Sequence, residues 1–217
     1  MGVLADFQTS LFSLGQLDVD SGAGFKHRCL DDHSWVDHAP AWLRGADDLL
    51  ADFARQLTWR RGRRPMYGRL VDEPRLNATL GPEHAQQWPV LDRIRVALEQ
   101  RYGAGLLDGF VNYYRDGRDS VAWHRDRIGA DQINPVVALV SLGGPRRFQL
   151  RPRIGGPTHQ LTLESGDLLV MGGACQHDWE HTVPKMAIAA PRMSISYRHV
   201  QDTPGHDWWY STQATAP

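Results

Sequence analysis

The stretch Ser120–Gly129, SVAWHRDRIG, decides how the chain is interpreted. Alternate residues of an extended strand project from the same face, so His124 and Asp126 can converge on one point while Arg125 points the other way. Imidazole nitrogens and carboxylate oxygens are both metal ligands. Alone, however, a histidine and an aspartate are more typical of a structural hydrogen bond. A metal site therefore requires a third ligand elsewhere in the chain.

The segment QHDWEHTVPK supplies that candidate. His181 precedes the turn-prone Val183-Pro184 pair, where the end of a strand can be held in place, and we favour it as the third ligand. His177 is the rival. Two imidazoles and one carboxylate on a rigid β scaffold form the facial triad that holds non-haem Fe(II) and leaves positions open. Zinc binds the same ligand types, so a zinc hydrolase is a weaker alternative.

The composition is that of an ordinary globular protein. Of 217 residues, 41% are hydrophobic and 23% are charged, which predicts one domain spanning 1–217. No apolar run approaches the roughly 18 to 20 residues that cross a bilayer, and the start lacks the features of a signal peptide, so we expect a cytoplasmic protein without membrane contact. The two cysteines have no paired spacing that would indicate a disulfide or structural zinc site. The formal net charge of −1 excludes a strong overall attraction to polyanions.

Periodicity predicts a mainly β protein of the α+β class. Apolar residues recur at helical spacing in 46–57 and 88–99, and 24–30 resembles a short strand. Beyond Gly109, short β-prone runs are separated by Gly, Pro and Asp. We expect strands at 110–114, 136–142, 147–150, 159–163, 167–171 and 193–199. Such strands need two packed sheets or a closed barrel to bury their apolar faces, and the N-terminal helices would cover one sheet.

The segment PRMSISYR places Arg192 and Arg198 on one face of a strand, together with Ser194 and Ser196. The residues between them give the opposite face its apolar character, which favours an inward-facing guanidinium pair over a surface strand. Arginine suits bidentate recognition of carboxylates, so a barrel interior that holds a dicarboxylate fits this pattern. In VNYYRDG, the same alternation gives a second pair of polar groups, Asn112 and Tyr114.

Taken together, these motifs resemble a known family. NYYRDG, WHRD, SLGGPRRFQL, SGDLLVMGG, WEHTVP and PRMSISYR occur in the order and spacing of the AlkB family of Fe(II)- and 2-oxoglutarate-dependent dioxygenases. WPVLDRIR resembles the helix before that family's catalytic core, and MYGRLVDEPR resembles its substrate lid more loosely. The resemblance implies an N-terminal extension and lid region over about 1–88, a catalytic core over about 89–200 and a tail over 201–217.

The resemblance also implies a double-stranded β-helix (jelly-roll) core and roles for individual residues. His124, Asp126 and His181 would bind Fe(II), with 2-oxoglutarate and O2 as cosubstrates. Arg192 would pair with the distal carboxylate of 2-oxoglutarate and Arg198 would lie near its metal-chelating end. The remaining implied cosubstrate contacts are Asn112, Tyr114, Ser194 and Ser196. Ser194 departs from the family pattern, because a hydroxyl replaces an amide, and Ile128 replaces an acidic residue that meets the damaged base.

The implied activity is oxidative demethylation of N-alkylated bases, such as 1-methyladenine and 3-methylcytosine, in DNA or RNA, with release of formaldehyde, succinate and CO2. The base must be flipped out or already single-stranded. The partner would be alkylated nucleic acid, with DNA favoured and no obligate protein partner. Candidate substrate contacts are Tyr67, Arg75, Trp88, Arg147 and Arg151. Candidate phosphate contacts are Arg60, Arg61, Arg63, Arg64, Arg146, Arg147, Arg151 and Arg153.

Other functions remain open at this stage. Ile128 and the few aromatic residues in the lid region also permit an oxygenase acting on a protein or a small molecule. A non-catalytic nucleic-acid binding module is disfavoured because the metal ligands and both arginines are present. The run WRRGRR, residues 59–64, can also be interpreted as a solvated turn.

Overall fold

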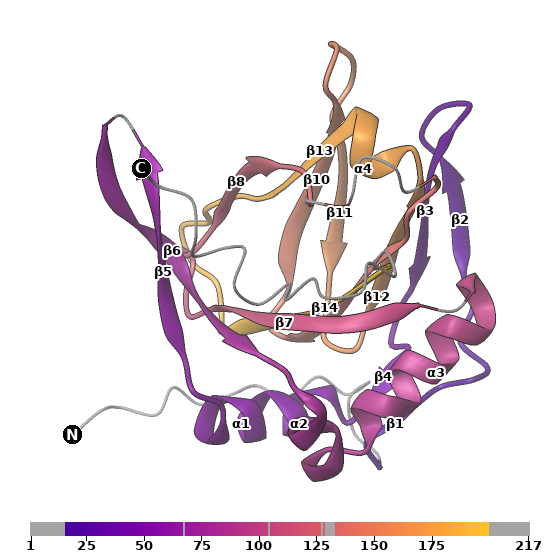
Figure 1. Ribbon diagram of the computed structural model, residues 1–217, viewed down its shortest axis with the longest axis vertical. Coiled ribbons are helices and arrows are strands. Elements are labelled where there is room, and N and C mark those ends of the chain that lie inside the picture. The colour runs from indigo at the N-terminus through magenta and orange to yellow at the C-terminus, as the bar shows by residue number, and fades with distance from the viewer. Residues whose placement is uncertain (1–15, 67, 104, 127, 129–132, 200–217) are drawn as a thin grey trace, which may run out of the picture.

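The computed structural model describes residues 16–66, 68–103, 105–126, 128 and 133–199 (Figure 1). Within these residues, the strands form an eight-stranded, a four-stranded and a two-stranded sheet in which all neighbours are antiparallel. The eight-stranded sheet has the spatial order β2 (Lys26–Cys29), β3 (Ser34–Ala39), β12 (Leu168–Gly173), β9 (Val137–Gly143), β14 (Arg192–His199), β7 (Leu106–Tyr114), β6 (Arg69–Thr79) and β5 (Arg60–Met66). The four-stranded sheet has the order β11 (His159–Leu163), β10 (Arg146–Pro152), β13 (Trp179–Val183) and β8 (Val121–His124). The small sheet pairs β1 (Asp18–Val19) with β4 (Leu43–Arg44).

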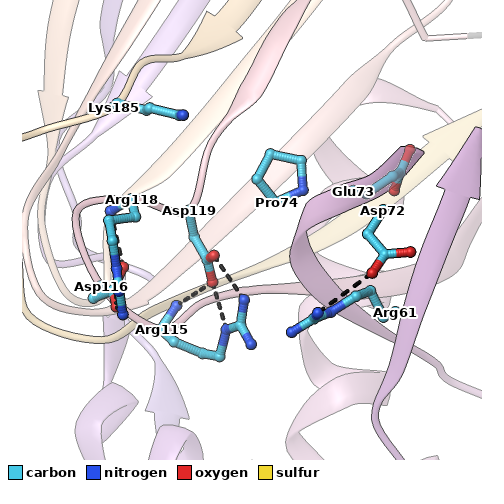
Figure 2. Close-up of a pocket in the computed structure, with 9 residues that line it drawn as sticks. All are labelled: Arg61, Asp72, Glu73, Pro74, Arg115, Asp116, Arg118, Asp119 and Lys185. Atoms are coloured by element: carbon cyan, nitrogen blue, oxygen red, sulfur yellow. Dashed lines mark hydrogen bonds and ion pairs between the residues drawn. The ribbon is translucent and has the colours of Figure 1, made fainter. Parts of the chain in front are cut away.

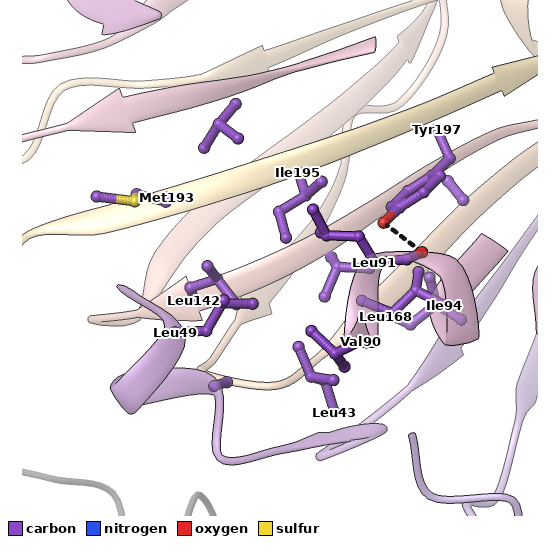
Figure 3. Close-up of a cluster of buried hydrophobic side chains, with 14 of the residues drawn as sticks. Leu43, Leu49, Val90, Leu91, Ile94, Leu142, Leu168, Met193, Ile195 and Tyr197 are labelled. Atoms are coloured by element: carbon purple, nitrogen blue, oxygen red, sulfur yellow. Dashed lines mark hydrogen bonds between the residues drawn. The ribbon is translucent and has the colours of Figure 1, made fainter. Parts of the chain in front are cut away.

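The central strands of the large sheet contribute to two separate cores. On β14, Met193, Ile195 and Tyr197 pack on the helix side of the sheet (Figure 3). Their neighbours on the other face include the buried Arg192 and Ser194. Strands β9 and β12 alternate in the same way, so the second core lies between the large sheet and the four-stranded sheet. Period-two alternation therefore gives each central strand one face toward the helices and one face toward the interior between the sheets.

Helices gather on one side of the large sheet, where Figure 1 shows α1 (Ala46–Gln56), α2 (Pro82–Gln87) and α3 (Val90–Tyr102) below β7 and β14. The buried face of α1 consists of Ala46, Leu49, Leu50 and Phe53, and that of α3 includes Leu91, Ile94 and Leu98. The two helices predicted at 46–57 and 88–99 are thus confirmed, with small differences at their ends. A fourth, one-turn helix, α4 (Cys175–Asp178), precedes β13. None of the described helices is both long and apolar enough to cross a membrane.

The six strands expected beyond Gly109 correspond to β7, β9, β10, β11, β12 and β14. The interpretation of residues 59–64 as a turn is wrong, because Arg60–Met66 forms strand β5, which pairs with β6 at the edge of the large sheet. Strands β3 and β6 were not predicted either. An edge strand tolerates charged residues on both faces, so β5 lacks the apolar alternation that identifies the inner strands.

Candidate metal centre and dicarboxylate site

His124 and His181 lie directly opposite each other on the paired strands β8 and β13. Their ring centroids are 4.3 Å apart. Asp126 follows the end of β8 and its backbone N–H donates a hydrogen bond to the buried Gln176 side chain at 3.1 Å. One ligand atom from each of His124, Asp126 and His181 lies within 4.8 Å of the others. Among the described residues this is the one such His/Cys/Asp/Glu group, and His177 is not part of it.

Both histidines are prepared to offer a nitrogen lone pair. Nδ1 of His124 lies 2.9 Å from the backbone carbonyl oxygen of Ala122, which can only accept, so Nδ1 carries the proton and Nε2 remains available. Burial lowers the pKa of His181 to about 4, although the adjacent Asp126 carboxylate opposes this shift. His181 is therefore neutral at pH 7, as a metal ligand must be. Phe148 from β10 stacks on the His181 ring at 5.4 Å.

The Asp126 carboxylate is buried and charged. Its Oδ1 accepts an ion-pair contact from Arg198 at 2.7 Å, and its Oδ2 lies 3.7 Å from Nε2 of His181. Burial acts to raise the pKa of the Asp126 carboxyl, but Arg198 and the two histidines outweigh it, and the pKa lies below its ordinary value. Arg198 thus keeps the Asp126 carboxylate ionised and oriented.

The predicted cosubstrate residues lie on neighbouring strands of the same interior. In the β14–β7 register, Arg192 is opposite Tyr114 and Ser194 is opposite Asn112. Arg192 is 1% exposed, and its Nη2 donates to Ser141 Oγ at 2.8 Å, whereas its Nε has no partner among the described residues. Burial lowers the pKa of Arg192 to about 10, which leaves the guanidinium charged at pH 7. An unsatisfied buried cation on this face indicates a site for an anion.

Arg75 reaches the same region from β6. Its Nε donates to Asn112 Oδ1 at 2.9 Å, and its Nη2 contacts Glu73 at 3.2 Å. Its Nη1 is buried and unpartnered among the described residues. The sequence-based prediction of Arg75 as a substrate contact is untested, but the structure brings the residue to the cosubstrate strands.

Other predicted substrate residues do not meet the triad. Trp88 is wrong as a substrate contact, because it is 6% exposed and packs edge-on against Phe53 in the helix-side core at 4.9 Å. Arg147 is exposed on the outer face of β10. Arg151 shares that face, pairs with Glu180 at 2.9 Å and lies over the Trp123 ring. Tyr67, the side chain of Arg64 and the tail 201–217 lie outside the described residues.

Arg146 is the clearest correction to the predicted phosphate contacts. Its side chain is 1% exposed and points inward from β10, on the same face as Phe148, so it cannot reach a nucleic acid on the surface. Phe148 and Gln176 were missed as supports of the triad. Alternation along β10 could have identified Arg146 and Phe148 as neighbours on one face. No sequence signal identifies Gln176, because α4 is too short to have a periodic pattern.

A surface pocket of about 490 Å³ lies apart from the triad (Figure 2). Its charged side chains carry four positive and four negative charges, and Figure 2 shows ion pairs between Arg115 and Asp119 and between Arg61 and Asp72. None of the triad residues lines it. Because these charges compensate one another, the pocket as a whole carries no net charge. Its lining residues are Arg61, Asp72, Glu73, Pro74, Arg115, Asp116, Arg118, Asp119 and Lys185.

The residues present fit both groups that the resemblance implies. Two imidazole nitrogens and a carboxylate converge with the donor set that suits Fe(II) with open positions. The buried N–H groups of Arg192, Arg198 and Arg75 without partners among the described residues suit the carboxylates of a diacid.

Comparisons with known proteins identify the family of the chain. The family model described as 2OG-Fe(II) oxygenase superfamily matches residues 82–200. The chain is similar to the alpha-ketoglutarate-dependent dioxygenase alkB homolog 3 of Mus musculus, with 30% identity over 183 residues that cover 75% of this chain and 64% of the relative. It is also similar to the DNA oxidative demethylase ALKBH2 of Mus musculus, with 31% identity over 124 residues that cover 53% of this chain and 52% of the relative. The chain therefore spans less than two thirds of the length of these relatives.

A solved structure supports the fold. The chain is similar to a prolyl hydroxylase from Trichoplax adhaerens, solved in complex with a peptide of hypoxia inducible factor, with a TM-score of 0.52, 15% identity, and coverage of 70% of this chain and 74% of that chain. At this identity the likeness shows the fold alone, and the predicted mainly β, jelly-roll class is confirmed. The chain belongs to the 2OG-Fe(II) oxygenase superfamily, and its resemblance to the AlkB-type dioxygenases within that superfamily is confirmed.

Proposed function

We propose that this protein demethylates N-alkylated bases, such as 1-methyladenine and 3-methylcytosine, in DNA or RNA. The observation that carries the proposal is the convergence of His124, Asp126 and His181 in an interior that also holds the buried Arg192. When bound, Fe(II) with 2-oxoglutarate and O2 would supply the oxidation of the N-alkyl group, and the products would be formaldehyde, succinate, CO2 and the repaired base.

The side chains of this chain would hold and orient the reactants. His124, Asp126 and His181 would hold the metal, and Arg198 would keep the Asp126 carboxylate aligned through its 2.7 Å contact. Arg192 would pair with the distal carboxylate of 2-oxoglutarate. Its register partner Tyr114 and the neighbouring pair of Asn112 and Ser194 would complete that end of the site. The two sheets on either side would limit the access of water to this chemistry.

The arginine-rich hairpin of β5 and β6 would retain the nucleic acid. Arg60, Arg61 and Arg63 on β5 are solvent-exposed, and the exposed Asp72 contacts Arg61 at 3.5 Å and Arg63 at 3.3 Å. Two of these guanidiniums thus share one carboxylate, which leaves net positive charge available for phosphates. A target base cannot be reached inside a duplex, so it would enter from a single strand or after flipping.

The experiment is turnover of defined methylated oligonucleotides by protein reconstituted anaerobically with Fe(II) and then exposed to 2-oxoglutarate and air. Mass spectrometry would follow the loss of each methyl group, and a parallel assay would measure succinate. We expect demethylation of 1-methyladenine or 3-methylcytosine with one succinate per methyl group, and none from the His124→Ala variant. Succinate formed without loss of any methyl group from the panel would contradict the nucleic-acid substrate while leaving the oxygenase chemistry in place.

A further inference from the structure

Arg146 is a buried cation that the roles described so far do not use. It is among the largest fully buried side chains, at 1% exposure. Its Nη2 donates to the backbone carbonyl oxygen of Asp116, and lies 3.4 Å from that of Asp119. Its Nε and Nη1 have no hydrogen-bond partner among the described residues. Burying two unsatisfied donors of a charged group is costly. Nε and Nη1 of Arg146 therefore need a hydrogen-bond acceptor that the described residues do not supply.

The position of Arg146 connects it to the distal end of the candidate site. The Arg146 guanidinium lies 5.7 Å from the centre of the Tyr114 ring, and the Arg192 guanidinium lies 5.3 Å from the same centre. Arg192 is close enough to Arg146 for their repulsion to contribute to the lowered pKa of Arg192, although burial is the larger cause. One buried tyrosine is therefore bordered by two guanidiniums.

No carboxylate of the described residues forms an ion pair with either guanidinium. The side chain of Asp119 accepts three hydrogen bonds from Arg115 (Figure 2). The side chain of Asp116 is paired with Arg118 at 2.6 Å. Only the backbone carbonyls of this loop face Arg146. Asp116 and Asp119 act on Arg146, and Asp167 acts on Arg192, only at longer range. Two buried positive charges thus lie without an ion-pair partner among the described residues, which favours the binding of an anion.

We propose that Arg146 is a second cosubstrate-binding residue, which binds the distal carboxylate of the dicarboxylate together with Arg192. This inference rests on the proposed function and adds to it a residue on β10, opposite the strand that carries Arg192. The loop carbonyls hold Nη2, so Nε and Nη1 are the donors left for the ligand. A carboxylate placed there neutralises both buried cations at once.

The test compares ligands that differ only at the distal end. Binding of 2-oxoglutarate and of 2-oxobutyrate, which keeps the keto-acid end and lacks the second carboxylate, is measured by calorimetry with Mn(II) in place of Fe(II). The variants are Arg146→Met and Arg146→Gln, and Gln retains an N–H that can donate to the carbonyls of Asp116 and Asp119. Arg147→Met, on the exposed face of the same strand, is the matched control.

We expect both Arg146 variants to bind 2-oxoglutarate about 10- to 100-fold more weakly, the range expected for losing a hydrogen bond to a charged group. The affinity of both Arg146 variants for 2-oxobutyrate should not change, and Arg147→Met should bind both ligands as the wild type does. The ligand-free Arg146 variants should melt no lower than the wild type, because an uncompensated charge has been removed.

Two results would overturn the assignment. If Arg146→Gln binds 2-oxoglutarate as tightly as the wild type, or loses affinity for both ligands equally, Arg146 only supports the 115–120 loop. The Gln variant decides this even if the Met variant fails to fold. If the wild type itself binds no 2-oxoglutarate, the proposed function fails first, and this outcome is distinct from a failure confined to Arg146.

Discussion

The interior between the two sheets and the β5–β6 hairpin both carry several arginines, yet the two regions treat them in opposite ways. In the interior, Arg192 and Arg146 are 1% exposed and lie on strands whose register fixes their neighbours. On the hairpin, the side chains of Arg61 and Arg63 are 48% and 62% exposed and share one aspartate. Because both regions use arginine, residue type does not distinguish them, and burial does. A buried guanidinium suits the recognition of one small anion, whereas exposed guanidiniums suit the attraction of a polyanion.

This contrast predicts large effects of substitutions in the interior and smaller, salt-dependent effects of substitutions on the hairpin. The largest effect is expected for His181→Ala, because it removes one of three metal ligands. We expect loss of Fe(II) binding and a fall in 2-oxoglutarate turnover of roughly a thousandfold or more. Anaerobic Fe(II) titration and succinate formation measure both quantities. His177→Ala, four residues earlier on α4, is the matched control and should retain them. The reverse result would make His177 the ligand.

The next largest effect is expected for Arg198→Met, which leaves the buried Asp126 carboxylate without its partner at 2.7 Å. Unfolding by urea in the absence of metal should show a loss of about 2–3 kcal/mol. Mn(II) should restore more stability to this variant than to the wild type, because the metal ion replaces the missing positive charge beside Asp126. Equal stabilisation of both proteins by Mn(II) would argue against this role. Arg125→Met, which points away from the site, should change neither value.

A smaller and salt-dependent effect is expected on the hairpin. Replacing Arg60, Arg61 and Arg63 by serine should weaken binding of a single-stranded oligonucleotide by about 10- to 30-fold at low salt. The slope of log affinity against log salt should decrease by about 2, at roughly 0.7 for each lost phosphate contact on a single strand. Affinity for 2-oxoglutarate should not change. If Arg147→Ser together with Arg151→Ser has the larger effect instead, the oligonucleotide binds across the four-stranded sheet and the hairpin is not its binding site.

The smallest effect on substrate binding is expected for Trp88→Phe. The side chain fills the helix-side core next to Phe53, so its truncation should cost about 1–2 kcal/mol of folding stability in thermal or urea unfolding. Oligonucleotide affinity at a temperature where the variant is folded should equal that of the wild type. A selective loss of oligonucleotide affinity would restore Trp88 as a substrate contact.

Sequence patterns predicted the interior better than the edges. On β14, polar and apolar residues alternate strictly, so the inward direction of Arg192 could be read from the sequence and agrees with the structure. The spacing of His124 and Asp126 likewise predicted their convergence. On β14 the face toward the helices consists of Met193, Ile195 and Tyr197, and such an apolar face allows only one register relative to the core.

The remaining features depended on long-range packing that local patterns do not contain. Strand β5 is recognised only through its pairing with β6, since its arginines resemble those of a solvated loop. Arg146 and Arg147 are adjacent in the sequence and suggested one basic patch, but the pleat of β10 buries the first and exposes the second. The sequence does not show whether Trp88 stacks on a base or packs in the core. In the structure, Trp88 packs in the core with residues of α1 and α3.

The most direct test of the central claim is a crystal structure of the protein with Mn(II) and 2-oxoglutarate, with the metal located by its anomalous scattering. The account predicts one metal ion bound by His124, Asp126 and His181, and a 2-oxoglutarate molecule whose distal carboxylate contacts Arg192. A metal ion bound elsewhere, or a diacid that lies away from Arg192, would contradict it.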